Sequence, residues 1–420
     1  MDPTMDDTTF RPSSILIFGA TGQIGRYITE AILTANPPFG SVAAFTSPTT
    51  ASSKAELLAG WAEKGLRVIQ GDVQAGPEVL KAYEGVDTVI SCLGRNVLLH
   101  QVELLRWADS SPSVKWFFPS EYGTDIEYCD KSRDERPHQM KLAVRKFVAE
   151  EVKAFQVTYL VTGPYADMFF HLKEGVEDAG GFDARRQKAV VIGDSMPVGF
   201  TTMPELVFSA FYSPFSSVSH YTDAGIFAHG WKCQKFSSCQ FSWGTKKGRL
   251  HIVIFTQEPP PHFLPNCPAA VPSTQHLVLI SPPPTRIVFL SSIRPPVLTY
   301  PHHSVGKGVV AALRHPEACP DRKAIKMQSF VVTPREILGA FEDLTAGAWA
   351  HVRYSTLDQV RELERRLWKE GSPDATVVTL KRIWAEGGTL YEKTDNEAIG
   401  LGEKDMESLK DVVGRAVKGG

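Results

Sequence analysis

Residues 19–25 (GATGQIG) constrain the fold of this chain more than any other feature of its sequence. They directly follow an apolar run, SILIF at 14–18, and they open a helical pattern over 24–33. In a strand, glycine turn and helix of this order, glycine permits the sharp turn and the close approach of a pyrophosphate, while the helix N-terminus offers unpaired N–H groups. The motif therefore predicts dinucleotide binding rather than an ordinary tight turn.

The region around this motif alternates short β-rich runs with helical runs. The strands are expected at 14–18, 42–45, 67–70, 88–92, 115–118 and 157–161, with helices between them such as 24–33, 53–64 and 77–83. Alternation of this kind is typical of a parallel, doubly wound sheet. We therefore expect an α/β fold in which residues 1–165 form an NAD(P)-binding Rossmann domain.

The end of the chain carries helical signals instead. Residues 333–336 (TPRE) place Thr at an N-cap, Pro at the first helical position and Glu at the capping-box position. Amphipathic runs follow at 355–369, 375–385 and 403–417. We expect residues 166–205 and 304–420 to form a smaller, mostly helical substrate domain.

A long segment, 206–303, separates the two halves of this second domain. Its 98 residues hold 13 of the 29 prolines, and its PPPHFLPNCP and SPPPTRIVFLSSIRPP runs are expected to interrupt helices and strands. The flanks read as continuous, with a helix start at Pro204-Glu205 and a helix body at 305–313. A retained intron or gene-model error is the favoured interpretation. A disordered surface insertion and a small genuine domain are the alternatives.

Composition and charge restrict the partners of the chain. Its 420 residues carry 45 Lys and Arg against 47 Asp and Glu, a balance that indicates neither a nucleic-acid partner nor an anionic membrane. No apolar run is long enough to span a bilayer, and the first 14 residues lack the features of a secretory signal. We expect a small-molecule substrate and a cytoplasmic location.

The cysteines do not predict a metal site or a disulfide framework. The six are scattered without a CxxC pair. Cys233, Cys239, His251 and His262 have spacings that match no standard zinc finger, so no metal is expected.

The second strand bears on the choice of dinucleotide. An acidic residue at its end would bind the ribose 2′-hydroxyl of NAD, and none is present. No arginine stands there either. Thr46, Ser47, Ser53 and Lys54 are candidate ligands of a 2′-phosphate, or they form an ordinary polar loop. The pattern favours NADP and leaves NAD open.

The fifth strand and the helix after it carry a family resemblance. A Tyr-x-x-x-Lys pair is absent, since neither Tyr122 nor Tyr165 is followed by Lys four residues on. Instead the chain has WFFPSEYG at 116–123 and a helical run with Lys141 and Arg145. With GATGQIG, these resemble the isoflavone reductase-like, NmrA-like group of atypical short-chain dehydrogenases, over about 13–205 and 304–415. The run 382–405 is similar to fungal members more than to plant ones.

The resemblance implies a role for several groups of residues. It implies that Lys141 is catalytic and that 186–202 is a strand pair over the active site. The phosphate-binding turn would consist of Gly19, Thr21, Gly22, Gln23, Ile24 and Gly25. Asp72 would lie beside the adenine, with Ser91, Cys92, Leu93, Pro119 and Ser120 near the nicotinamide, and Tyr165, Met168 and Phe169 in the substrate pocket. Plant members have Arg just after the second strand, where Ser47 stands here.

Four positions remain open between a functional and a structural role. Glu121 and Tyr122 follow a strand at its carboxyl end and are candidates for the substrate pocket, although Glu121 is equally suited to an ion pair with a basic neighbour. Lys141 is either catalytic or part of a solvated helix face. His138, three residues earlier, either assists proton transfer or is a surface histidine.

The predicted function follows from this lysine and the dinucleotide. Hydride delivery to an enone, imine or benzylic carbon builds negative charge, and an ammonium can stabilise or protonate it. We expect an NAD(P)H-dependent reductase of a small aromatic or polyketide-like secondary metabolite. The alternative is an NmrA-like regulator that senses the dinucleotide without turnover and binds a protein partner.

Overall fold

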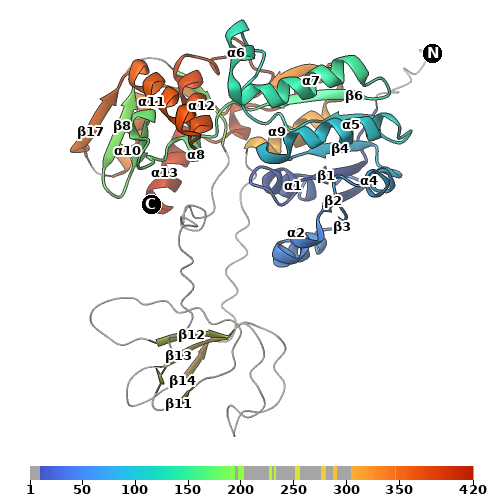
Figure 1. The fold of residues 1–420 in the computed structure, drawn as a ribbon, viewed down its shortest axis with the longest axis horizontal. Helices are drawn as coiled ribbons and strands as arrows, with labels where there is room; N and C mark the ends of the chain where they lie inside the picture. Colours follow the sequence, from blue (N-terminus) through green and yellow to red (C-terminus); the bar gives the residue numbers. More distant parts are fainter. Residues whose placement is uncertain are drawn as a thin grey trace. The chain divides into compact units, whose positions relative to one another are not determined.

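The structure, a computed structural model, describes residues 10–193, 197–202, 304–345 and 347–419, together with short strands between 227 and 290 (Figure 1). The chain divides into two compact units. One consists of Met1–Phe211 with Pro301–Gly420, and the other is Tyr212–Tyr300. The first unit carries all the predicted site residues.

The centre of the first unit is a seven-stranded sheet in which every neighbouring pair is parallel. In spatial order its strands are β15 (Lys323–Lys326), β6 (Gln156–Val161), β5 (Trp116–Phe118), β4 (Thr88–Ser91), β1 (Ser14–Phe18), β2 (Ser41–Thr46) and β3 (Leu66–Gln70). The order reverses between β1 and β4, as in a doubly wound sheet. The predicted Rossmann-like α/β fold is confirmed, and all six predicted strands are present.

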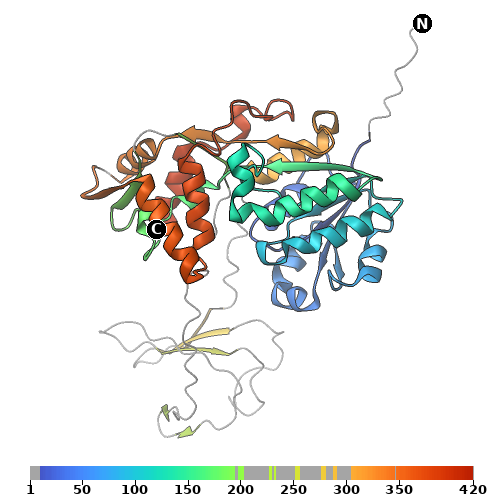
Figure 2. The ribbon, with the colours of Figure 1, turned by 45° about the horizontal axis from the view of Figure 1, so that its top comes forward.

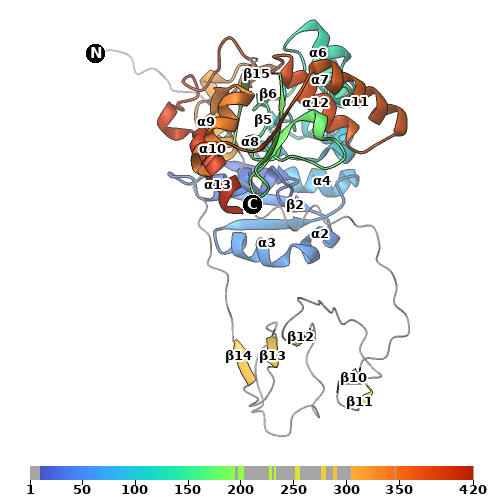
Figure 3. The same ribbon diagram turned by 90° about the vertical axis from the view of Figure 1, so that its left-hand side faces the viewer.

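The apolar run of β1 is buried on both faces because helices cover both sides of the sheet. Successive side chains of a strand point to opposite faces, so Ile15 and Ile17 pack in one core cluster and Leu16 and Phe18 in another. The first cluster includes residues of α1 (Gly25–Leu33), α3 (Ala55–Ala62) and α9 (Ser304–Arg314). The second includes α4 (Gly76–Tyr83), α5 (Gln101–Asp109) and α7 (Gln139–Glu151), and the two layers are visible in Figure 3.

Two elements from beyond the insertion complete this sheet layer. Helix α9 packs against α1, and β15 pairs with β6 as the edge strand. The predicted Rossmann boundary at residue 165 leaves both of them out. The strand was missed because its sequence, KAIK, is only four residues long and has lysines at both ends. Helix α9 confirms the helix predicted at 305–313.

The rest of the first unit contains two further small sheets. One has the order β17 (His351–Ser355), β8 (Lys188–Ile192) and β7 (Gly181–Asp183), and the other pairs β9 (Val198–Phe200) with β16 (Phe330–Val332). The strand pair predicted within 186–202 is therefore wrong, since β8 and β9 do not pair with each other. The buried β8 is instead a central strand with a partner on each side.

The helices of this part follow their predicted signals. Thr333 caps α10 (Pro334–Leu344) through a complete capping box with Glu336, as predicted. Helices α11 (Leu357–Glu370) and α12 (Ala375–Ala385) match their amphipathic runs and lie side by side (Figure 2). Helix α13 (Leu409–Gly419) begins six residues later than the predicted run, after the short helix η6 (Glu403–Asp405). The remaining helices are α2 (Pro48–Ser53), η1 (Arg95–His100), α6 (Asp130–Asp134), η2 (Arg136–His138), α8 (Ala166–Phe169), η3 (Glu177–Ala179) and η5 (Pro316–Ala318).

The described residues on either side of the insertion lie close together. The hydroxyl oxygens of Thr202 and Ser304 lie 2.7 Å apart, although 101 residues separate them in sequence. The helix start predicted at Pro204-Glu205 lies outside the described residues.

The second unit contains five described strands. They are β10 (Phe227–Ala228) and β11 (Trp231–Lys232), which pair, and an antiparallel sheet of β12 (His251–Phe255), β13 (His276–Ile280) and β14 (Ile287–Leu290). Strand β14 lies in a proline-rich run that was expected to interrupt strands. That expectation is wrong because IVFL holds four consecutive apolar residues without proline. Of the four candidate zinc ligands, only His251 belongs to a described strand.

Candidate active site

The glycine turn is packed tightly against the end of β4. Gly19 has a positive φ of 71°, and a Cβ added there would lie 2.6 Å from the carbonyl oxygen of Cys92. A Cβ at Gly25 would lie only 2.1 Å from the carbonyl oxygen of Gly19. Both positions therefore require glycine. The structure thus brings the predicted phosphate-binding turn and the predicted nicotinamide-side residues together.

The carboxyl ends of β1, β4 and β5 meet beside this turn. The amide of Cys92 donates to the carbonyl of Phe18 (2.8 Å), and the hydroxyl of Ser120 donates to the carbonyl of Leu93 (2.9 Å). The Ser120 amide is held in turn by the side chain of Gln101. Burial raises the pKa of the Cys92 thiol to about 12, so this thiol stays neutral. Open α/β sheets bind ligands along this edge. The residues that lie there include Ser91, Cys92, Leu93, Pro119 and Ser120, and their place near the nicotinamide stays a prediction.

The residues after β2 and β3 form a polar stretch of their own. The Ser47 hydroxyl accepts from the amide of Thr50 and so caps α2. Thr46 ends β2, and Lys54 ends α2 with an exposed side chain. Asp72 is exposed, and its carboxylate accepts from the amide of Gln74. A 2′-phosphate would therefore compete with an existing cap at Ser47, while Lys54 is exposed to solvent.

Lys141 lies near the end of β5, in the first turn of α7. Its ammonium donates to the backbone carbonyl of Glu121 (2.8 Å), and its side chain is 14% exposed. Burial lowers the pKa of Lys141 to about 8, and the charges of Arg95 and Arg145 act in the same direction. Lys146, by contrast, is 73% exposed. Lys146 therefore lies on the solvated face of the helix, and Lys141 does not.

Glu121 forms a buried ion pair with Arg145. The guanidinium donates from Nε to Oε1 and from Nη2 to Oε2, both at 3.2 Å, and the carboxylate is 1% exposed. Glu127 and Asp125 complete the shell of the guanidinium, at 2.8 and 3.6 Å from Nη1. The carboxylate is thus occupied by a structural pair, which is the alternative that its sequence position left open.

His138 is buried rather than a surface histidine, with 2% of its area exposed. Its Nδ1 donates to the carbonyl oxygen of Ser132 (2.7 Å), whereas Nε2 has no hydrogen-bond partner among the described residues. Burial lowers the pKa of His138, and the nearby charges of Lys141 and Arg95 lower it further. The ring is therefore neutral at neutral pH, and Nε2 carries a free lone pair.

The predicted pocket residues differ in exposure. Tyr122, Tyr165 and Phe169 are buried, and Phe169 packs against Phe200 and Trp384. Burial raises the pKa values of Tyr122 and Tyr165, so neither phenol ionises near neutral pH.

Met168 alone among them is substantially exposed, at 41%. The side-chain amide of Gln23 reaches its sulfur (3.4 Å), so the glycine turn contacts α8 directly. The predicted phosphate and substrate regions therefore adjoin each other.

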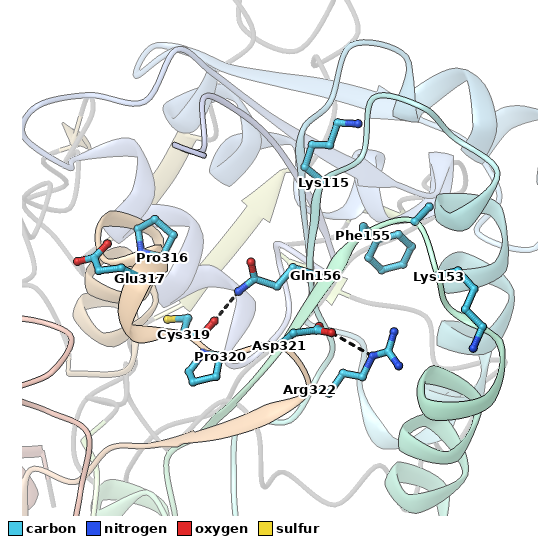
Figure 4. A pocket seen from close by; sticks show the side chains of 11 residues that line it. Lys115, Lys153, Phe155, Gln156, Pro316, Glu317, Cys319, Pro320, Asp321 and Arg322 are labelled. Atoms are coloured by element: carbon cyan, nitrogen blue, oxygen red, sulfur yellow. Dashed lines mark hydrogen bonds and ion pairs between the residues drawn. The ribbon is translucent and has the colours of Figure 1, made fainter. Parts of the chain in front are cut away.

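A pocket of about 580 Å³ lies elsewhere, at the opposite edge of the sheet (Figure 4). Its lining includes Lys115 and Gln156, just before β5 and at the start of β6, and Asp321 and Arg322, just before β15. These are the amino ends of parallel strands, where ligands of such sheets do not bind. Within its lining, Asp321 and Arg322 form an ion pair, and the side chain of Gln156 donates a hydrogen bond to the carbonyl of Cys319. It contains none of the predicted site residues.

Two cations that act on Lys141 were not predicted as site residues. Arg145 lies four residues after Lys141, and this spacing places both residues on one helix face. The spacing alone could have identified Arg145 as a neighbour of Lys141. Arg95 donates to the carbonyl of Pro137 (2.8 Å) and thereby joins η1 to η2, the short helix just before α7. No local pattern indicates this second contact, because the two residues are 42 positions apart.

Neither a membrane span nor a metal centre is found where the structure describes the chain. No helix there is both long and apolar enough to cross a bilayer. In the same residues, no three His, Cys, Asp or Glu side chains are grouped as metal ligands.

Comparison with known proteins gives relatives that match part of this chain. An isoflavone reductase of Cicer arietinum is 32% identical over 197 residues, which cover 43% of this chain and 58% of that protein. Phenylcoumaran benzylic ether reductase of Pinus taeda is 29% identical over 183 residues, with the same two shares. The chain therefore spans less than two thirds of the relatives that it matches.

Solved structures agree with this in fold. A crystal structure of an isoflavone reductase aligns with a TM-score of 0.59 and 18% identity, over 96% of this chain and 98% of that one. Leucoanthocyanidin reductase of Vitis vinifera, solved in complex with NADPH, has a TM-score of 0.59 and 14% identity, over 97% and 100%. Residues 11–181 match the NmrA-like family, and part of the chain is similar to plant isoflavone reductases.

Proposed function

We propose that the chain is an NADPH-dependent reductase of a small aromatic or polyketide-like secondary metabolite, with Lys141 as the proton donor. The observation that carries this proposal is the state of Lys141. Its side chain is 14% exposed, and its ammonium lies at the carboxyl edge of the sheet, where burial lowers its pKa to about 8. A pKa near the working pH is what general acid catalysis requires.

The cofactor assignment is supported by the glycine turn. A Cβ at Gly19 would clash with the backbone of Cys92, and a Cβ at Gly25 would clash with the carbonyl of Gly19. These are the tight turn and the close helix packing that the first and third glycines of a dinucleotide-binding motif provide. The structure of the Vitis vinifera relative contains NADPH, and no carboxylate follows β2 to select NAD. Residues 19–25 would hold the pyrophosphate, and the ends of β4 and β5 would face the nicotinamide. The bound cofactor supplies hydride.

Lys141 provides the other half of the reduction. An ammonium has three N–H donors, and the carbonyl of Glu121 takes one of them. The others remain for a substrate oxygen on which negative charge develops. Since the pKa of Lys141 is about 8, most molecules carry the ammonium at neutral pH, yet its proton is released more easily than that of an exposed lysine.

The substrate class is supported by the aromatic side chains beside this site. Phe169 packs with Phe200 and Trp384 near the exposed Met168, and Tyr122 and Tyr165 are buried as neutral phenols. The side chain among them that is open to a ligand is Met168, whose thioether packs favourably against aromatic rings. The relatives of Cicer arietinum and Pinus taeda are named as reductases of aromatic compounds, which agrees with this class.

The proposal is tested by turnover. Purified chain is mixed with NADPH and a panel of isoflavones, benzylic ethers, aromatic enones and quinones, and loss of NADPH absorbance is followed. We expect at least one class to be reduced. Lys141→Met should lower kcat by about 100-fold or more with little change in the NADPH Kd. Tight binding of the dinucleotide without turnover of any class would favour the sensing regulator.

A further inference from the structure

The carboxylate of Glu121 has two cationic neighbours, Arg145 and Lys141, and its contacts with Arg145 are shorter. Arg145 donates two hydrogen bonds to the carboxylate, each 3.2 Å long. The Nζ atom of Lys141 lies 3.8 Å from Oε2, the same oxygen that accepts from Arg145 Nη2. The lysine directs its short hydrogen bond to the backbone carbonyl of Glu121 instead.

Arg145 is fixed in this position from several sides. Glu127 accepts from Nη1 at 2.8 Å, and Asp125 lies 3.6 Å from the same nitrogen. The guanidinium carbon lies 4.4 Å from the ring centre of Tyr159. Only 7% of the side chain is exposed. Planar, two-point pairing of this kind is specific to arginine.

The charged groups that face Lys141 come from several elements. Glu121 and Asp125, in the segment after β5, favour its charged form, while Arg95 of η1 and Arg145 of α7 oppose it. His138, one helical turn earlier, is neutral. An unshared carboxylate 3.8 Å away would raise the pKa of the lysine and offset its burial. Here the positive charge of Arg145, which pairs with that carboxylate, opposes its effect on Lys141.

We propose that Arg145 is a positioning residue that pairs with the Glu121 carboxylate and so prevents this carboxylate from holding Lys141 in its protonated form. The lysine can then release a proton near neutral pH. The proton-donating role of Lys141 in this statement rests on the proposed function. The transfer breaks one N–H bond of Lys141 and forms one bond to the anion left by hydride addition. Water then returns a proton to the amine.

The experiment measures the protonation of Lys141 without a substrate. The full chain is treated with trace acetic anhydride between about pH 6 and pH 11, and acetylation of the Lys141 peptide is quantified by mass spectrometry. The exposed Lys146 serves as the internal reference. The wild-type midpoint is expected at about 8.

Two substitutions should move this midpoint in opposite directions. Arg145→Met should raise it by about one pH unit or more, because the carboxylate then acts on Lys141 alone. Glu121→Gln should lower it, because the negative charge is lost. Arg145→Lys keeps a positive charge and should restore much of the wild-type value. Glu127→Gln, which contacts Arg145 but not Lys141, should leave it unchanged.

A merely structural role for Arg145 predicts a different pattern, in which stability falls but the midpoint stays. An unchanged or lowered midpoint in Arg145→Met overturns the proposal. If that variant does not fold, Glu121→Gln decides, since a midpoint that fails to fall is equally contradictory. The expected shifts in a chain that never oxidises NADPH would instead overturn the proposed function alone.

Discussion

A Cβ on residue 25 would lie 2.1 Å from the carbonyl oxygen of Gly19, closer than any non-bonded atoms can approach. Gly19 itself has φ of 71° and faces the carbonyl of Cys92. The first turn of α1 is therefore locked to the end of β1 by two glycines. This contact excludes every other residue type at the two positions.

Gly25→Ala should consequently abolish dinucleotide binding. The added methyl pushes α1 away from the turn, at a cost of roughly 1–3 kcal/mol in the free energy of unfolding. Gly60→Ala is the matched control, since a Cβ at this helical position of α3 meets nothing within 4 Å. Isothermal titration with NADPH checks the binding and urea unfolding checks the stability. Equal NADPH affinity in both variants would contradict the assigned role of the turn.

Local patterns predicted the parts of the fold whose causes are local. The continuous apolar run of β1 and the capping box at Thr333 each appear as predicted, because burial on two faces and a side-chain cap have sequence signatures. Strand β15 and the partners of β8 could not be predicted in the same way. Their pairing depends on segments that are distant in sequence, and KAIK has no apolar pattern.

The site shows the same division. Lys141 was placed by a motif, but its burial follows from elements that no motif describes. Arg95 donates to the carbonyl of Pro137. Arg145 pairs with the carboxylate of Glu121, a residue that the sequence also suggested for the substrate pocket. The sequence showed these charges without showing which of them meet.

A second buried lysine gives a pH-dependent prediction. Lys381 is 5% exposed, donates to the carbonyl of Gly180, and has its pKa lowered to about 8 by burial. Between about pH 8 and pH 10 the folded chain binds fewer protons at this group than the unfolded chain, so its contribution to stability rises with pH. The buried charge is fully destabilising only below this window.

Lys381→Met should therefore change the pH dependence of stability. The free energy of unfolding of the variant minus that of the wild type should fall as the pH rises from about 8 towards 10. Urea unfolding at several pH values measures this difference. The exposed Lys146→Met is the control and should give a flat difference. A flat difference for Lys381→Met as well would mean that the lysine titrates normally in the folded chain.

The insertion gives a third prediction. Because the hydroxyls of Thr202 and Ser304 lie 2.7 Å apart, removal of residues 206–303 leaves ends that three residues can join. Closing a short connection costs little conformational entropy. The shortened chain should fold, with a cooperative thermal transition, and should bind NADPH as the full chain does. A shortened chain that is unfolded would show that the first unit depends on the insertion.

The most direct test of the central claim is a titration of the purified 420-residue chain with NADPH and with NADP⁺, with Lys141→Ala in parallel. We expect NADPH to bind tightly to the wild type and to Lys141→Ala alike, because Lys141 acts on the substrate and residues 19–25 hold the dinucleotide. Failure of the wild-type chain and of the chain without residues 206–303 to bind NADPH would contradict it. A marked preference for NADP⁺ would also count against a reductase and favour a sensor of the oxidised cofactor.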